Sequence, residues 1–316
     1  MGAIELAEEY RQRGVEASHL LCSDMLDLPT FAGLLRDRLS TTEISLYFHE
    51  NQFAYPWSER EKYRVAHRRY LGQMNVKSAL IADRCFFNSQ FNLDTFLDGT
   101  REMIREAPEA FSSEIASAIQ EKSSVLPLGI DCREAVGRER NEERIILWNH
   151  RWEEDKDPNT FFHILFELAN EGVPFGLVVL GQPQDVVLPI FEEAKSKLAP
   201  RIKHFGYIET KDEYHSLVSE CDVLPVTSKH DFFGISVLEA VAAGVVPLLP
   251  KSLVYPEHFS PDEFLDFYYS SKAELKDKLR VLLTDENKVD VEPIREVARG
   301  YSWERVIPKY VELFGA

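Results

Sequence analysis

Hydrophobic residues follow two different periods along this chain, and the two periods take turns. Short apolar runs of strand length alternate with longer stretches in which apolar residues recur every three or four positions, as on an amphipathic helix. The predicted strands of the first half span residues 15–22, 44–48, 84–88 and 124–128. Those of the second half span residues 144–148, 176–180, 202–205, 222–226 and 245–249. Such alternation predicts an α/β fold with parallel sheets.

The predicted helices lie between these strands. The chain opens on a helix around residues 4–10, which ends at Gly14 and has no strand before it. Further helices of the first half are predicted at residues 28–38, 61–82, from about 92 onward, and at 112–120. Those of the second half are predicted at residues 159–170, 187–198, 211–219, 234–244, 272–283 and 301–314. We therefore expect two Rossmann-like domains, the first of which lacks an opening strand.

The boundary between these domains is predicted in a charged segment without periodicity, Asp131–Glu143. This places an amino-terminal domain at residues 1–135 and a carboxy-terminal domain at residues 136–316. The terminal helix predicted at residues 301–314 can pack back on the first domain. A length of 316 residues with 44% hydrophobic content supports two proper cores.

The composition narrows the function classes. The 36 Lys and Arg residues face 53 Asp and Glu residues, which gives a net charge of −17 at pH 7. This charge argues against broad binding to nucleic acids or anionic membranes but leaves room for a local basic patch. The four cysteines lack C-x-x-C spacing and favour reduced thiols over a metal or disulfide role. Because no apolar run approaches about 18 residues and no signal peptide opens the chain, we expect a cytoplasmic protein without a membrane span.

The stretch His230–Pro250 carries the first candidate chemistry. It contains Asp231, then Gly234 where a loop turns into a helix, and then Glu239 on that helix. The first N–H groups of a helix lack partners and carry a partial positive charge, which suits a phosphate. Two carboxylates thus flank a phosphate-sized gap. A helix with one structural acid is the alternative.

Two further loops follow predicted strands. Arg151 and Lys156 follow strand 144–148 and precede a helix with Pro158 in its first turn. Two fixed cations at such a place suit a diphosphate, and surface salt bridges are the alternative. His49 directly follows strand 44–48, at the end where open α/β sheets bind ligands. A structural role is the alternative for His49.

One predicted helix is cationic, with aromatic residues in between, although the protein as a whole is acidic. A solvated helix face explains this pattern, and a docking patch for the phosphates of an acceptor such as RNA is the functional alternative. The helix covers Arg60–Tyr70, and its cations are Arg60, Lys62, Arg64, Arg68 and Arg69.

The stretch around Gly234 resembles the E-x7-E signature of the retaining family 4 glycosyltransferases. The matching residues are Asp231-Phe232-Phe233-Gly234, Leu238-Glu239-Ala240, Ala242, Gly244 and Pro247. In that family the first acid contacts the donor sugar, the backbone around the Gly meets the diphosphate, and the second acid holds the ribose. An Arg and a Lys at the place of Arg151 and Lys156 neutralise the leaving diphosphate. The first acid here is Asp231, which is one methylene shorter than the Glu of the signature.

Three separated motifs narrow the resemblance to the tRNA-queuosine alpha-mannosyltransferase group. They are Ser45–Gln52, His150–Pro158, and Phe232–Gly234 together with Pro250–Glu257, and Ser23–Phe31 is similar as well. The resemblance covers nearly the whole chain. It implies a GT-B fold, in which two Rossmann-like domains with parallel sheets enclose a cleft. The family's first strand and a Gly-Gly-Ser-His loop are absent, so the amino-terminal domain is expected to be incomplete.

The activity implied by this resemblance is a metal-independent, retaining transfer of a hexose, mannose from GDP-mannose, to queuosine in a tRNA. The cations and the helix N–H groups would stabilise the leaving phosphate, so no metal or other cofactor is expected. The implied catalytic residues are His49, Arg151, Lys156 and Asp231. The implied donor-binding residues are Phe233, Gly234, Ile235, Glu239, Gly181 and Tyr207. The expected partners are the nucleotide sugar and, through the Arg60–Tyr70 helix, the tRNA.

Two other function classes stay open. A nucleotide-sugar epimerase or a phosphorylase would share the two-domain architecture, and Asp231 with the Gly234 loop argues against both. A scaffold that binds a nucleotide sugar without catalysis is favoured by the shortened start and by Asp in place of Glu.

Overall fold

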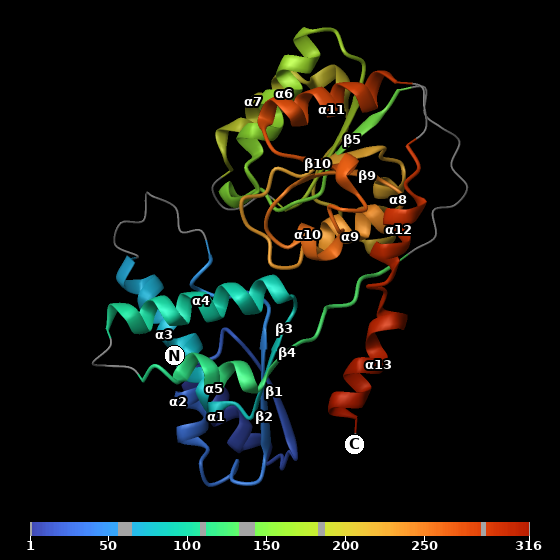
Figure 1. Ribbon diagram of the computed structural model, residues 1–316. Helices are drawn as coiled ribbons and strands as arrows, with labels where there is room; N and C mark the ends of the chain where they lie inside the picture. The colour runs from blue at the N-terminus through green and yellow to red at the C-terminus, as the bar shows by residue number, and fades with distance from the viewer. Residues whose placement is uncertain are drawn as a thin grey trace. The chain divides into compact units, whose positions relative to one another are not determined.

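The computed structural model describes residues 2–55, 65–107, 112–132, 143–182, 187–285 and 289–315. The chain divides into two compact units (Figure 1). The first consists of Met1–Pro127 and Lys309–Ala316, and the second of Leu128–Pro308. The boundary expected after residue 135 falls within residues 133–142, which lie outside the described residues.

The amino-terminal unit is built on a sheet of four parallel strands that lie side by side in chain order. The strands are β1 (His19–Ser23), β2 (Glu43–Phe48), β3 (Arg84–Phe87) and β4 (Ser123–Val125). The helices are α1 (Gly2–Arg13), α2 (Leu28–Leu34), α3 (Val65–Ile81), α4 (Gln90–Glu106) and α5 (Ile115–Glu121). The absence of an opening strand stays a prediction.

Aromatic rings fill the core of this unit. The rings of Phe48 and Phe87, on neighbouring strands, stack at 4.4 Å, and Phe96 of α4 packs on both. The end of the last helix, α13 (Trp303–Phe314), belongs to the same unit. There the Tyr310 hydroxyl donates to the Pro127 carbonyl at 3.1 Å, and the Phe314 ring lies on that of Phe86. The terminal helix therefore ends against the amino-terminal unit.

The carboxy-terminal unit has a parallel sheet of six strands in the order β10-β9-β8-β5-β6-β7. The strands are β5 (Ile145–Trp148), β6 (Gly176–Leu180), β7 (Ile202–Gly206), β8 (Val223–Pro225), β9 (Val246–Pro250) and β10 (Tyr268–Tyr269). The chain lays down β5, β6 and β7 in one direction and then returns to add β8, β9 and β10 on the other side. This is the strand order of a doubly wound Rossmann sheet. The strands all run parallel, but the side on which new strands are added changes between β5 and β8.

Helices cover both faces of this sheet (Figure 1). Near one another lie α6 (Pro158–Asn170), α7 (Pro189–Lys197) and α11 (Lys272–Thr284), with α6 in contact with both others. The remaining helices are α8 (Lys211–Ser219), α9 (Ile235–Ala242), α10 (Tyr255–His258), α12 (Glu292–Arg299) and the start of α13, and α12 packs on α9. A core around Trp148, Phe162 and Phe191 joins the sheet to α6 and α7.

The α/β class, the parallel sheets and the alternation of elements are confirmed. The sequence analysis missed three elements, α10, β10 and α12. Helix α10 has four residues and β10 has two, which is too short for any period to show. Among the described residues, every helix is too short or too polar to cross a membrane.

Candidate active site

The loops that follow β5 and β8 meet at the carboxyl ends of these strands. In a doubly wound sheet, the crevice where the strand order reverses is the usual ligand site. Several hydrogen bonds join the two loops. The Lys229 amide donates to the Asp155 carbonyl at 2.7 Å, the Thr227 hydroxyl to the Lys156 carbonyl at 2.8 Å, and the Lys156 ammonium to the His230 carbonyl at 2.7 Å. The two predicted site loops therefore form one assembly.

Lys156 and Asp231 form a buried ion pair inside this assembly. The Lys156 Nζ lies 2.9 Å from Oδ1 of Asp231 and 3.1 Å from Oδ2 of Asp155. Burial by itself would lower the pKa of Lys156, but these two carboxylates outweigh it and raise the pKa. Burial would likewise raise the pKa of Asp231, but Lys156 and other hydrogen-bonding partners hold it below its usual value. Both side chains are therefore charged at neutral pH.

The second oxygen of Asp231 also has a partner. The hydroxyl of Tyr255, a fully buried residue of α10, donates to Oδ2 of Asp231 at 2.5 Å. Asp231 is thus held between a cation on one oxygen and a phenol on the other. Its predicted contact with a donor sugar has to be made by lone pairs that these two partners leave unused.

Gly234 starts helix α9 in the left-handed conformation, with φ 70° and ψ 47°. A side chain at this position would be strained, which explains the glycine. The first N–H groups of α9 lie directly after it and have no acceptor within the helix. In the same turn, the Ser236 hydroxyl lies 3.1 Å from Nδ1 of His150. The start of α9 therefore lies beside the loop that carries the predicted cations.

His150 is buried in the wall of this site. Burial lowers its pKa to about 4, so the ring is neutral at pH 7. Within the part of the chain that the structure describes, its Nε2 is buried without a hydrogen-bond partner. Its carbonyl oxygen lies only 2.2 Å from where a Cβ at position 181 would be. Gly181 is therefore required by the close approach of two backbone segments, whatever its role toward a ligand.

Glu239 lies on α9, half-buried beside Tyr214. The Tyr214 hydroxyl is 3.4 Å from Oε2 of Glu239 and also accepts from the Asn149 amide at 3.3 Å. Burial raises the pKa of Glu239 to about 7. This carboxyl group therefore titrates in the physiological range, and its oxygens can accept hydrogen bonds from hydroxyl groups.

Three predicted site residues of the carboxy-terminal unit are exposed. Arg151 has 63% of its side chain exposed and pairs with Glu153 at 3.1 Å. Tyr207 and Ile235 are 58% and 41% exposed. Arg151 is accessible to a ligand, and the roles of all three stay predictions.

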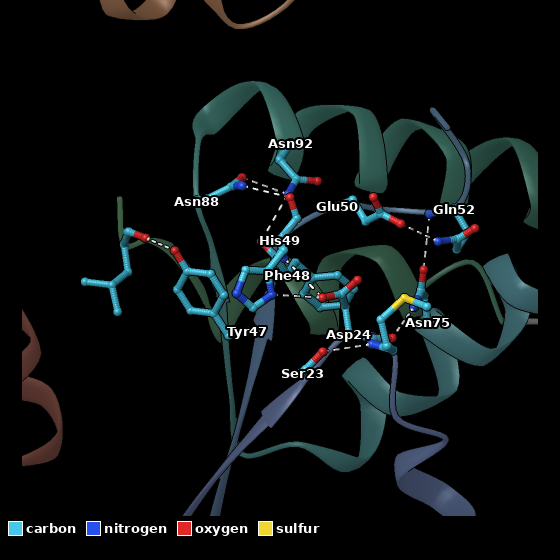
Figure 2. Close-up of polar contacts among 12 residues, drawn as sticks. Ser23, Asp24, Tyr47, Phe48, His49, Glu50, Gln52, Asn75, Asn88 and Asn92 are labelled. Carbon is cyan, nitrogen blue, oxygen red and sulfur yellow. Dashed lines mark hydrogen bonds and ion pairs between the residues drawn. The ribbon is translucent and has the colours of Figure 1, made fainter. Parts of the chain in front are cut away.

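His49 lies in the amino-terminal unit, directly after β2 (Figure 2). Its backbone N–H and its ring Nδ1 both lie 3.2 Å from Oδ1 of Asp24, which follows β1. A carboxylate only accepts hydrogen bonds, so Nδ1 carries a proton that points at Asp24, and Nε2 is the ring nitrogen that does not face it. The His49 side chain is 55% exposed, whereas that of Asp24 is 1% exposed. Asp24 thus orients an exposed histidine at the carboxyl edge of the sheet.

Buried amides surround this pair (Figure 2). The Asn75 amide donates to the Asp24 carbonyl at 2.9 Å, and the Asn88 amide donates to the His49 carbonyl at 2.8 Å. Asn92 donates to Oδ1 of Asn88 at 2.9 Å. In the described residues, Oδ2 of Asp24 is buried without a hydrogen-bond partner. The backbone around His49 is therefore rigid, and one carboxylate oxygen remains unsatisfied.

The sequence analysis missed several residues of these two sites. Asp24 and His150 lie inside the motifs that carry the family resemblance, but their residue types do not indicate which residues they contact in the fold. Tyr255 and Asp155 contact Asp231 and Lys156, and nothing in spacing along the chain predicts that. Of the cationic helix predicted at Arg60–Tyr70, residues 60–64 lie outside the described residues, and residues 65–70 belong to α3. Of its cations, only Arg69 has a described side chain, and it lies 3.6 Å from Glu106.

Comparisons with families follow the division into two units. Residues 1–130 match the family described as tRNA-queuosine alpha-mannosyltransferase N-terminal. Residues 133–296 match the glycosyl transferases group 1. The tRNA-queuosine alpha-mannosyltransferase of Drosophila melanogaster is 29% identical over 306 residues, which are 93% of this chain and 80% of that protein.

Solved structures are similar in fold. A sucrose-phosphate synthase from Thermosynechococcus elongatus has a TM-score of 0.68 at 14% identity, over 99% of this chain and 76% of that one. A glycosyltransferase from Rickettsia africae has a TM-score of 0.61 at 16% identity, over 98% of this chain and 79% of that one. The fold is therefore GT-B, as expected from the resemblance.

Proposed function

Because the chain belongs to the glycosyl transferases group 1, and through its amino-terminal unit to the tRNA-queuosine alpha-mannosyltransferase subfamily, we propose that it transfers mannose from GDP-mannose to queuosine in tRNA. The chain is a glycosyltransferase. The donor, the acceptor and the stereochemical course are the proposal. The observation that supports it best is the buried Lys156–Asp231 pair beside the start of α9.

The proposed reaction breaks one carbon–oxygen bond and forms another with retained configuration. The bond from the anomeric carbon of mannose to the diphosphate oxygen breaks, and the bonding pair stays on that oxygen. An acceptor hydroxyl attacks from the same face, and its proton goes to the leaving phosphate oxygen. Negative charge therefore grows on the diphosphate, and the site has to stabilise it.

The cations and helix N–H groups of the carboxy-terminal unit suit that requirement. Lys156 is a charged group of fixed position. The exposed guanidinium of Arg151 can donate hydrogen bonds to two phosphate oxygens at once. We assign the diphosphate to these two residues and to the start of α9 after Gly234. The proposed transfer requires no metal ion and no other cofactor, because these donors would stabilise the charge on the leaving diphosphate.

We assign the two acids of the signature, Asp231 and Glu239, to different parts of the nucleotide sugar. We assign the sugar hydroxyls to Asp231, because its carboxylate is charged and oriented. We assign the ribose hydroxyls to Glu239, which lies further along α9 from the loop. His49 presents Nε2, the ring nitrogen that does not face Asp24, to a hydroxyl of the donor sugar or the acceptor.

The test is transfer itself. Queuosine-containing tRNA is incubated with the protein and one nucleotide sugar at a time, and its nucleosides are analysed by mass spectrometry. A hexose should appear on queuosine with GDP-mannose, and it should stay absent with tRNA that carries guanosine at that position. A hexose from another donor would move the proposal to that donor, and no hexose from any donor would refute it.

The alternatives give different results in the same experiment. A scaffold would bind a nucleotide sugar in calorimetry and leave both sugar and tRNA unchanged. An epimerase would change the sugar of the donor without any acceptor. A phosphorylase would need inorganic phosphate and would leave the tRNA unmodified.

The proposed tRNA contact is tested separately. If the Arg60–Tyr70 helix meets the RNA backbone, reversing Arg64 and Arg68 to Glu should weaken tRNA binding and lower its salt slope by about two. Donor binding should stay unchanged. An unaltered salt slope would place the tRNA elsewhere on this acidic protein.

A further inference from the structure

The four-residue helix α10 packs against the loop that leads into α9, although it lies outside the E-x7-E signature. It follows Leu253, whose φ of 62° is unusual for a residue with a branched side chain. Tyr255 and His258, three positions apart on α10, are both buried. Both make hydrogen bonds to the loop that leads into α9, so the contact is made twice.

Tyr255 acts on the side chain of that loop. Its hydroxyl donates to Oδ2 of Asp231, while Lys156 binds Oδ1. The last torsion of an Asp side chain is soft, so the carboxylate could otherwise rotate and chelate the ammonium with both oxygens. With a different partner on each oxygen, that rotation costs a hydrogen bond. The ring of Tyr255 also lies under Gly234, with Cε1 3.3 Å from where a Cβ would be.

His258 acts on the backbone of the loop. Its Nε2 lies 2.8 Å from the Phe233 carbonyl oxygen, which only accepts, so Nε2 carries the proton. Its Nδ1 then accepts from the Tyr301 hydroxyl at 2.9 Å. Burial lowers the pKa of His258 to about 4, and this agrees with a neutral ring in one tautomer.

We propose that Tyr255 and His258 are positioning residues of the donor site: Tyr255 sets the orientation of the Asp231 carboxylate, and His258 sets the path of the backbone into Gly234. The inference rests on the proposed function, because it takes Asp231 as the residue that receives the donor sugar. Asp231 is then sufficient in place of the longer Glu of the signature, because the Tyr255 hydroxyl fixes the orientation of its carboxylate.

Tyr268 provides a matched control. Its hydroxyl lies 2.8 and 2.5 Å from the carbonyl oxygens of Tyr255 and Phe259, to which its single proton donates, and so holds α10 without touching Asp231. Tyr268→Phe and Tyr255→Phe each remove one buried hydroxyl from the same region. A purely structural role predicts the same result for both variants.

The decisive readout is the titration of Asp231, followed by carboxyl NMR, together with kcat and KM for transfer. The hydrogen bond from Tyr255 and the charge of Lys156 both lower the pKa of Asp231. In Tyr255→Phe the Asp231 titration and the acid limb of kcat should move to higher pH, and kcat should fall about tenfold or more, the size of one hydrogen bond to a charged group. In Tyr268→Phe neither the titration nor the acid limb should move. Equal behaviour of the two variants would overturn the assignment of Tyr255.

Two substitutions test His258. Gln can place an amide donor where Nε2 lies, whereas Asn reaches only as far as Nδ1. His258→Gln should keep donor affinity in calorimetry, and His258→Asn should weaken it about tenfold. Equal affinity of both variants would overturn the role of His258.

Asp231→Asn separates this inference from the proposed function. If Asp231→Asn transfers normally, Asp231 does not receive the sugar, and the proposed site fails together with the positioning role. If Asp231→Asn loses transfer while Tyr255→Phe keeps it with an unmoved Asp231 titration, only the inference fails.

Discussion

The two units present polar groups at the same kind of place, the carboxyl ends of parallel strands, but they bury charge in opposite ways. In the carboxy-terminal unit, Lys156 lies between the carboxylates of Asp155 and Asp231, and Tyr255 donates to the second oxygen of Asp231. In the amino-terminal unit, the Asp24 carboxylate contacts His49 through Oδ1, and its Oδ2 is buried without a hydrogen-bond partner among the described residues. Buried charge is tolerable when it is paired and costly when it is not. Removing the cation from the carboxy-terminal site should therefore be destabilising, whereas neutralising Asp24 should not lower stability.

The largest effect is expected where the pair is broken. Lys156→Met leaves Asp231 buried without its cation, which should lower the free energy of unfolding by about 3–5 kcal/mol. Transfer should fall at least about hundredfold, since a charge-stabilising group is lost. Urea denaturation and steady-state kinetics measure the two effects. Lys229→Met is the control, because the Lys229–Asp157 pair has a lysine that is 62% exposed and should contribute less than about 1 kcal/mol.

Arg151→Ala should reproduce the catalytic loss without the loss of stability. Its side chain is 63% exposed, so little packing is removed. Transfer should fall about hundredfold at an unchanged denaturation midpoint. Near-normal turnover would remove Arg151 from the diphosphate site.

Asp24→Asn should separate stability from activity in the other unit. Oδ1 can still accept from the His49 backbone, while the unpaired buried charge disappears. We expect the free energy of unfolding to stay the same or rise, and transfer to fall about tenfold because His49 loses its charged partner. A loss of stability as large as that of Lys156→Met would show that the two units do not differ as described.

The last prediction concerns how the stability contribution of Glu239 depends on pH. The folded pKa of Glu239 is about 7, above its ordinary value of 4.5, so the folded state holds a proton that the unfolded state releases between these values. This group therefore favours folding below about pH 4.5 relative to higher pH, and the contribution is lost as pH rises through about 7. Glu239→Gln should be more stable than the parent at pH 8 and equal to it at pH 4.5. A difference that is the same at both pH values would place the titration elsewhere.

Much of the fold could be predicted, because long elements show their period. The strands at 44–48, 84–88 and 176–180 were predicted within a residue of β2, β3 and β6. Helix α10 and strand β10 could not, since four and two residues span about one period each and so show no repeat. Yet α10 supplies Tyr255 and His258, so the least predictable element carries the support of the site.

The sequence by itself determined the α/β class, the family and the residues that carry charge, because periodicity and motif spacing depend only on order along the chain. It predicted Arg151, Lys156, Asp231 and Glu239 as separate candidates. Only the tertiary structure decided which of them meet: residues 156 and 231, 75 positions apart, form a 2.9 Å contact. It also decided their protonation, since the pKa of a buried group depends on neighbours brought together by folding. That is why Glu239 titrates near neutral pH while Asp231 stays charged.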